Sequence, residues 1–458
     1  MTKISIPSPP LILSLVGIIL GSTLGVALIP DQVNAVASLR WAAASMALGL
    51  IISPLSIAIK KPIALLHPVS LLLVGLVYWL LIDLIQARYL LEISDTNAAR
   101  LSFVCIALFA LGIVLAAARF PPPLPVALRN AAMVNLGPTL IFRIGVFAFI
   151  LSFLRFAVPA DFNVFRIYEA LFLPRFSAPW ARGALGGWDS FLDHLSYFGY
   201  LLPSLTVLMY RVESKVSFRV ALLALMAVLI ALLLAQGGGR RIVGALALAA
   251  GLTWVITARY QGRALLGLSL FGIPAILMYL QYVLVTRSLG IGGAGEISTK
   301  DLFSEGIAVD DNINRLSQLV EIIPSQVPHV GFDWVYLILV RPIPRAFWPG
   351  KPEGLDFSLP EFLGMEGVSL TASVVGESYM AFGFFGCLIT GLLYGYLSRR
   401  LLKVLDYSAY VGALQMYILG LIALFVGLRS AVDLVLFSYG FLAWIAVVYL
   451  FRGRQRLA

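Results

Sequence analysis

Long runs of apolar residues, separated by short polar segments, dominate the pattern of this chain. Each run has about 18 to 22 residues, the length that an α-helix needs to cross a hydrocarbon core about 30 Å thick. We therefore predict an all-α, polytopic integral membrane protein, one membrane domain over residues 1–458, with about twelve transmembrane helices. The predicted spans are residues 11–30, 41–59, 64–85, 101–119, 137–158, 192–211, 217–236, 241–258, 264–285, 380–397, 409–427 and 431–451.

Composition and charge support this prediction. Hydrophobic residues make up 60% of the chain and charged residues 12%, whereas soluble domains carry about 25% charged residues. The formal net charge is +10, but most basic residues lie in short connections between the spans. If both termini are cytoplasmic, these basic connections lie on the cytoplasmic side of the membrane. Anionic lipid and the positive-inside rule explain the charge, so it does not indicate nucleic acid.

Two segments are predicted not to cross, residues 159–190 and the large loop of residues 286–379, and both face outward by parity. The large loop contains the apolar stretch "FDWVYLILV" at residues 332–340, which is too short to span. Pro342 and Pro344 end a helix there, because proline lacks an amide donor and restricts the residue before it. This stretch is either a re-entrant or interfacial helix, or a helix packed within the loop.

The turn "AQGGGRRIVGAL", residues 235–246, also faces outward in this topology, where basic turns are scarce. A flexible glycine segment that leads into a helix N-terminus suits an anion. Arg240 and Arg241 add guanidinium groups that can bind phosphate oxygens in pairs. The alternative is a tight turn whose arginines reach the lipid headgroups.

Five further basic residues occupy the same predicted side: Arg287, Arg341, Arg345, Lys351 and Arg429. Any one of them could be an interface anchor. Together with the glycine–arginine turn they favour a polyanionic ligand at the outer membrane surface.

Carboxylates on this side are fewer. Glu377 lies beside Tyr379 at the outer entry to a span, as a candidate general base or as a helix-start carboxylate favoured by the dipole. Ser430 and Asp433 form an S-x-x-D pattern, which we interpret as a capping box rather than a catalytic pair. Asp310, in "VDDN", is interpreted as part of a solvated turn.

Three other polar residues are weaker candidates. A structural role is favoured for His329, which lies near Asp333 in the large loop. Arg143, inside a predicted span, could contact a lipid-linked anion or a structural partner.

Metal and nucleotide motifs are absent from the sequence, so we predict no metal site and no cofactor.

The last half of the chain resembles a known family. "RPIPRAFWPGKPEG", "SLTASVVGESYMAFGFFGCLITGLLYGYLSRR" and "GLRSAVDL", with the "GGGRR" turn, resemble the O-antigen polymerases (Wzy-type oligosaccharide repeat-unit polymerases) over about residues 230 to 440. The resemblance implies a GT-C-like fold in the bacterial inner membrane. It also implies a metal-independent glycosyltransferase that polymerises undecaprenyl-pyrophosphate-linked repeat units into surface polysaccharide at the outer face.

The resemblance also suggests roles for the candidate residues. Arginines would neutralise the pyrophosphate, and a carboxylate would remove the proton of the acceptor hydroxyl. We expect Glu377, Arg241 and Arg345 to be catalytic. Pyrophosphate binding is expected from Arg240, Arg241, Arg287, Arg341, Arg345, Lys351 and Arg429. Sugar or prenyl contacts are conceivable for Trp348, Tyr379 and Phe382, although packing is the more common role of such aromatics.

Expected partners are lipid-linked oligosaccharides, membrane lipids, and a chain-length regulator and flippase of the same pathway, with no nucleic acid. Two alternatives stay open. One is a related enzyme that ligates finished glycan to another acceptor, and the other is a transporter or flippase of lipid-linked glycans. A secondary transporter would tend to show two related halves with carboxylates near the midplane, which the sequence lacks.

Overall fold

A computed structural model describes residues 4–33, 36–87, 95–119, 122–174, 177–181, 188–236, 239–286, 309–352, 354–365 and 370–455. All regular secondary structure in these ranges is helical, which confirms the predicted all-α class. The first helices are α1 (Leu11–Ala27), η1 (Val36–Leu39), α2 (Arg40–Ala58), η2 (Pro62–Leu66), α3 (Pro68–Leu76), η3 (Val77–Leu81), α4 (Ile82–Gln86), α5 (Thr96–Ala117), α6 (Val126–Ala132) and α7 (Pro138–Ala157).

The middle of the chain forms α8 (Val164–Ala170), α9 (Trp188–Ser196), η4 (Tyr197–Leu201), α10 (Leu202–Glu213), α11 (Phe218–Gln236), α12 (Arg240–Thr257), α13 (Gln261–Gly267), η5 (Leu268–Gly272) and α14 (Ile273–Thr286). The last part forms α15 (Asn312–Ile322), α16 (Phe332–Val340), α17 (Leu359–Phe362), α18 (Ser373–Val404), η7 (Leu405–Tyr407), α19 (Val411–Gly427) and α20 (Ala431–Gln455).

A helix or a run of consecutive helices lies at every predicted span. In the described residues, nine such segments are long and apolar enough to cross a membrane, and α1 and α19 are shorter apolar helices. The predicted span 192–211 differs, because it is divided among α9, η4 and α10. Polar Asp193 and His194 lie in the first turn of this span, and Asp189 lies just before it on α9. The protein is therefore a helical membrane-embedded protein.

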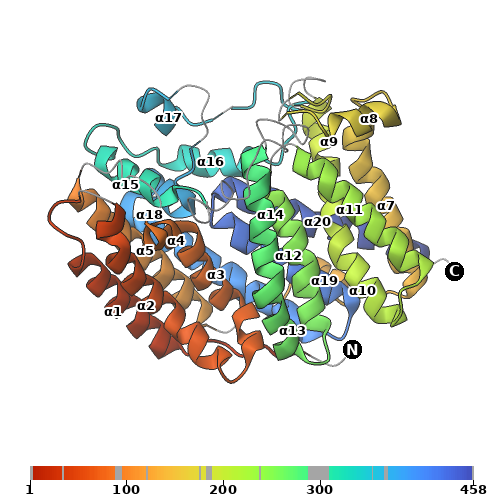
Figure 1. Ribbon diagram of the computed structural model, residues 1–458, viewed down its shortest axis with the longest axis horizontal. Helices are drawn as coiled ribbons and strands as arrows, with labels where there is room; N and C mark the ends of the chain where they lie inside the picture. The colour runs from red at the N-terminus through yellow and green to blue at the C-terminus, as the bar shows by residue number, and fades with distance from the viewer. Residues whose placement is uncertain are drawn as a thin grey trace.

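The helices form a bundle with one distinct face. In Figure 1, α1 to α5 lie on one side, α12 and α14 cross the middle, and α7, α10 and α11 lie on the other side. The short helices α8, α15, α16 and α17 gather at one face of the bundle, and α13 lies at the opposite end. We call the face that carries these four helices the loop face.

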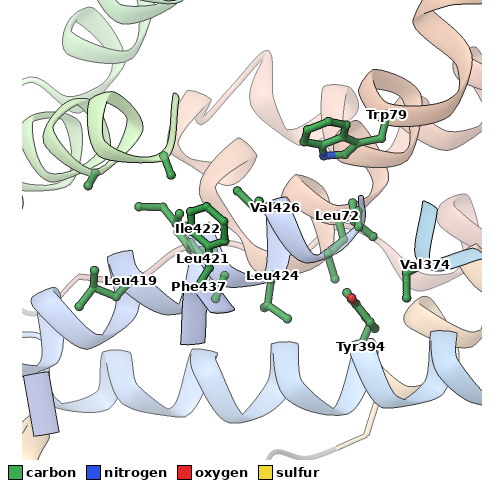
Figure 2. Packing of buried hydrophobic residues seen from close by; sticks show 14 of the residues in the cluster. Leu72, Trp79, Val374, Tyr394, Leu419, Leu421, Ile422, Leu424, Val426 and Phe437 are labelled. Carbon is green, nitrogen blue, oxygen red and sulfur yellow. The ribbon is translucent and has the colours of Figure 1, made fainter. Parts of the chain in front are cut away.

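Helix α19 is the centre of the core. Nearly all of its residues are buried, and its side chains meet those of α3, η3, α18 and α20 (Figure 2). Polar atoms of the buried aromatic residues bond to backbone carbonyls: the Tyr394 hydroxyl donates to Gly427 O at 2.6 Å, and the Trp79 indole to Phe425 O at 3.0 Å. These bonds satisfy polar groups that would otherwise be costly to bury among helices.

Glycine allows α5 and α18 to pack with their backbones in contact. A Cβ atom added at Gly391 would stand 2.2 Å from the carbonyl oxygen of Phe109, and one at Gly395 would stand 2.3 Å from that of Ile113. Small residues at such crossings are typical of helix pairs in membranes.

We expect Gly391→Ala to lower the free energy of unfolding by roughly 1–3 kcal/mol, because the methyl group forces α5 and α18 apart. The matched control is Gly267→Ala in α13, where an added Cβ meets no atom within 4 Å. Melting temperatures of the two purified variants in detergent measure the difference. Equal melting temperatures would show that the backbone contact does not limit this site.

Helix α18 begins at Ser373, seven residues before the predicted start of its span, and it bends at Phe382 and Gly383. Gly383 has φ of +63°, a left-handed conformation that glycine adopts without strain. The bend exposes the carbonyls of Met380 and Ala381, which accept hydrogen bonds from the amides of Val330 and Gly331 at 3.1 and 3.0 Å. The segment before α16 is therefore fixed to the bend.

The apolar stretch 332–340 forms α16, which packs against α18 and α20. Its Phe332, Tyr336 and Leu339 side chains remain exposed. The stretch is therefore a helix that packs against the bundle on one side and leaves apolar side chains exposed on the other.

Candidate functional site

Three arginines and two aspartates from separate parts of the chain meet near the loop face. Arg429 bridges the two carboxylates, with Nε 2.6 Å from Asp310 and Nη1 3.0 Å from Asp433. Arg241 pairs with Asp433 at 2.8 Å, and Arg240 with Asp310 at 3.4 Å. We call these five residues the arginine–aspartate cluster. The predicted convergence of Arg240, Arg241 and Arg429 is thus present in the structure.

Two helix N-termini bring these residues together. Helix α12 begins at Arg240, directly after Gly239, and no side chain of the described residues caps it. Helix α20 begins at Ala431, just after Arg429. The positive end of a helix dipole and its free amides favour an anion at such a position.

The start of α20 carries the capping interaction that the sequence predicted. The Ser430 hydroxyl accepts the Asp433 amide at 3.0 Å, and Glu377 Oε2 accepts the Ala431 amide at 2.8 Å. Asp433 also has a second role, because its carboxylate holds Arg241 and Arg429. The structure therefore shows the Ser430 half of the predicted capping box, while the Asp433 carboxylate binds arginines.

The three guanidinium groups of the cluster share the carboxylates of Asp310 and Asp433, and the Glu377 carboxylate lies nearby at the start of α20. Asp433 has only 1% of its side chain exposed, whereas Arg241 has 34%. Burial lowers the pKa of Arg429, but Asp310 and Asp433 outweigh it and leave that pKa above its ordinary value. Arg241 is the most accessible of the three cations.

The interpretation of Asp310 as part of a solvated turn is wrong. Its side chain is 23% exposed and contacts both Arg240 and Arg429, and its neighbour Asp311 pairs with Arg315. In the predicted topology, two carboxylates and several arginines lie on the same, outer side of the membrane. That coincidence is the signal from which the ion pairs could have been predicted. Sequence separation of about 70 residues from Arg240 and 119 from Arg429 hides this pairing.

Arg341, Arg345 and Lys351 form a second basic group in the turn after α16. Lys351 is buried, and its ammonium donates to the carbonyls of Arg341 and Ile343 at 2.9 and 2.8 Å. Burial, with the nearby charges of Arg341 and Arg345, lowers the pKa of Lys351. Lys351 therefore stabilises the turn through these two hydrogen bonds. Its position in the sequence did not predict this structural role.

Arg345 has a different environment from Lys351. Its guanidinium donates to Pro352 O at 3.3 Å, and the residue lines a cleft of about 390 Å³ together with Trp188, Ala346 and Pro349. No contact described in the structure joins Arg345 or Lys351 to the arginine–aspartate cluster. The predicted basic residues are therefore divided between two groups.

Aromatic residues lie between these two groups. Tyr439 packs against Tyr197 and His194, with ring centroids 4.8 and 4.9 Å apart. The Arg341 charge lies close enough to the Tyr439 hydroxyl to interact with it, and the Arg241 charge has the same relation to the Tyr197 hydroxyl. The aromatic residues therefore lie between Arg341 and Arg241. The sequence analysis did not identify this aromatic group, because Tyr439 lies more than 200 residues along the chain from His194 and Tyr197.

Several other predicted residues contact the bend of α18. Tyr379 is buried and its hydroxyl donates to Ile323 O at 3.0 Å, while Phe382 packs on Phe332 with centroids 5.2 Å apart. His329 Nδ1 lies 3.3 Å from Met380 O. These contacts give Tyr379, Phe382 and His329 packing roles in the structure.

The remaining predicted residues do not join the cluster. Trp348 is half-buried in the turn after α16, and Arg143 is exposed in the second turn of α7. Arg287 lies outside the described residues. Among the described residues, no group of three or more histidine, cysteine, aspartate or glutamate side chains could hold a metal ion.

Comparison with known proteins gives no match: no family model, no curated protein and no solved structure matches this chain. The site must therefore be interpreted from its own chemistry.

Proposed function

We propose that this protein is a metal-independent glycosyltransferase that polymerises undecaprenyl-pyrophosphate-linked oligosaccharide repeat units into surface polysaccharide. The polysaccharide is O-antigen, exopolysaccharide or capsule. The observation that carries the proposal is the arginine–aspartate cluster, with its partly exposed Arg241 guanidinium, beside the N-terminus of α12, which has no side-chain cap. A basic site of this kind on an apolar helical bundle suits a lipid with a pyrophosphate headgroup.

Cationic groups are the main requirement of this reaction, because its leaving group is a pyrophosphate. The acceptor hydroxyl oxygen forms a bond to the anomeric carbon of the donor glycan, and the bond from that carbon to the pyrophosphate oxygen breaks. Undecaprenyl pyrophosphate leaves with the electron pair, and the hydroxyl proton passes to a base. Guanidinium groups that bind the leaving oxygens stabilise the charge that develops there.

Arg241 is the proposed principal contact to the leaving pyrophosphate because it is the most exposed cation of the cluster. Glu377 is the proposed general base. One of its oxygens accepts the Ala431 amide, which fixes the carboxylate at the start of α20, next to Arg429. Arg345, which lines its own cleft, is proposed to hold the second lipid-linked substrate.

The proposal includes a location and partners. It places the loop face at the outer surface of the bacterial inner membrane, with twelve crossings, both termini in the cytoplasm and a GT-C-like architecture. A flippase would supply the lipid-linked units, and a chain-length regulator would act on the product.

Deletion of the gene, followed by analysis of surface polysaccharide and lipid-linked intermediates, tests the proposal. We expect loss of long chains while single repeat units still reach the surface or remain on lipid at the outer face. Lipid-linked polymer of normal length would instead indicate ligation, and repeat units confined to the inner face would indicate transport. Either of these two outcomes would overturn the proposed polymerase.

A further inference from the structure

A groove lies at the end of the bundle opposite the loop face, between α10, α12 and α13. It has a volume of about 490 Å³. Small residues form much of its lining, including Ala250, Gly251, Ala264 and Gly267, and Trp254 forms part of its wall. Its single charged lining residue is Arg263. In Figure 1, α13 lies at the far end of the bundle from α16 and α17, so this groove is separate from the arginine–aspartate cluster.

The shape of the groove follows from glycine and from a π-helical turn. Helices α13 and α14 are joined by the π-helical turn η5 (Leu268–Gly272), and such turns displace the helix axis. An added Cβ at Gly267 would meet no atom within 4 Å, which shows that the space beside it is empty. The open space beside Gly267 leaves room for a flexible hydrocarbon chain.

The surface around the groove is one that contacts lipid in a membrane. Leu266, Leu270 and Phe271, next to it on α13 and η5, are 58–76% exposed. The segment Gln261–Leu284 is long and apolar enough to span a membrane, and little of it is buried by the rest of the protein. Acyl chains are thus the molecules that reach this groove directly.

Basic side chains surround the end of the groove at which α12 finishes and α13 begins. Arg263 and Arg259 are both exposed and lie 5.2 and 5.5 Å from the ring centroid of Tyr260. Arg211 stacks 4.0 Å from the ring of Trp254 and donates to Thr257. In the described part of the chain, no carboxylate forms an ion pair with Arg259 or Arg263. Among these cations, only Arg263 lines the groove, so it is the one placed to contact an anionic headgroup bound there.

We propose that this groove binds one anionic glycerophospholipid, with an acyl chain along Gly267 and Trp254 and its phosphate on Arg263. The inference is independent of the glycosyltransferase proposal, because the groove and the cluster lie at opposite ends of the bundle. An acyl chain supplies the apolar contact, and Arg263 selects the negative headgroup. Zwitterionic lipid has the same chains but lacks the net charge.

Native mass spectrometry of the purified protein, titrated with phosphatidylglycerol and separately with phosphatidylcholine, tests the proposal. We expect a first phosphatidylglycerol to bind at least about 5-fold more tightly than phosphatidylcholine, since one basic residue near a lipid phosphate contributes about 1 kcal/mol. Arg263→Gln should remove most of this preference. Gly267→Leu should weaken both lipids about 5-fold or more by filling the groove.

Arg259→Gln is the matched control, because Arg259 carries the same charge at the same interface but does not line the groove. Its affinity for phosphatidylglycerol should stay within about 2-fold of the wild type if the site is the one proposed. Equal binding of the two lipids, or an equal loss in Arg259→Gln and Arg263→Gln, would overturn the proposal. Wild-type binding by both Arg263→Gln and Gly267→Leu would do the same.

Discussion

Replacing Arg241 with glutamine is expected to reduce glycan chain extension about 100-fold or more, while the protein still inserts and folds. Removing one donor that stabilises a developing oxyanion costs about 10²–10³ in rate. Folding should survive, because Asp433 keeps its ion pair with Arg429 at 3.0 Å when Arg241 is neutral. The measurement is the distribution of polysaccharide chain lengths in cells that lack the native gene, with protein amount measured in the membrane fraction.

Three further variants make this result specific. Arg241→Lys keeps the charge but loses the forked geometry, so it should retain partial activity. Arg345→Gln should also abolish extension, since Arg345 is proposed to hold the second substrate. Arg143→Gln is the control, because Arg143 is an exposed arginine of α7 outside the cluster. Wild-type chain lengths in both Arg241→Gln and Arg345→Gln would rule out the proposed pyrophosphate site.

The largest effect on stability is expected for Asp433→Asn. Asp433 is almost fully buried and sits between Arg241 and Arg429. Loss of its charge removes the carboxylate partner of Arg241 and leaves the mostly buried Arg429 with Asp310 alone. Removing one partner of a buried pair costs about 3–5 kcal/mol, and the remaining pair with Asp310 places the expected loss at the lower end of that range. Melting temperature and the free energy of unfolding in detergent measure the change.

Asp31→Asn is the matched control for Asp433→Asn. Asp31 also pairs with an arginine, Arg100 at 2.9 Å, but 98% of its side chain is exposed. An exposed pair contributes about 0–1 kcal/mol, so this variant should behave like the wild type. The double variant Arg241→Gln/Asp433→Asn should recover part of the lost stability. If Asp433→Asn is as mild as Asp31→Asn, the cluster does not stabilise the fold.

The positions of the helices could be predicted because the hydrocarbon core sets the length of each apolar run. The start of α18 could not, because the turns before Met380 are held by neighbours rather than by their own hydropathy. The bend at Gly383 depends on amide donors from Val330 and Gly331, which belong to a segment some 50 residues earlier. Local sequence does not contain that information.

Part of the candidate site could be predicted, because the number of membrane crossings assigns each connection to one side of the membrane. Counting crossings puts Arg241 and Arg429 on the same side, and helix starts then bring them near each other. The partner Asp310 could not be assigned, because its place depends on the path of the large loop. The hydrogen bonds from Lys351 to two carbonyls of its own turn could not be predicted either. A lysine near two prolines is not a sequence pattern that indicates such bonds.

The pairing of Asp310 has a consequence for turnover under the proposed function. This carboxylate pairs with Arg240 and Arg429, so a pyrophosphate that binds these arginines must exchange with an anion that is covalently tethered to the site. A tethered competitor is present at a high effective concentration, and it returns as soon as the leaving group loosens. The protein thereby limits its own affinity for spent carrier lipid, which lets the carrier leave and the next repeat unit enter.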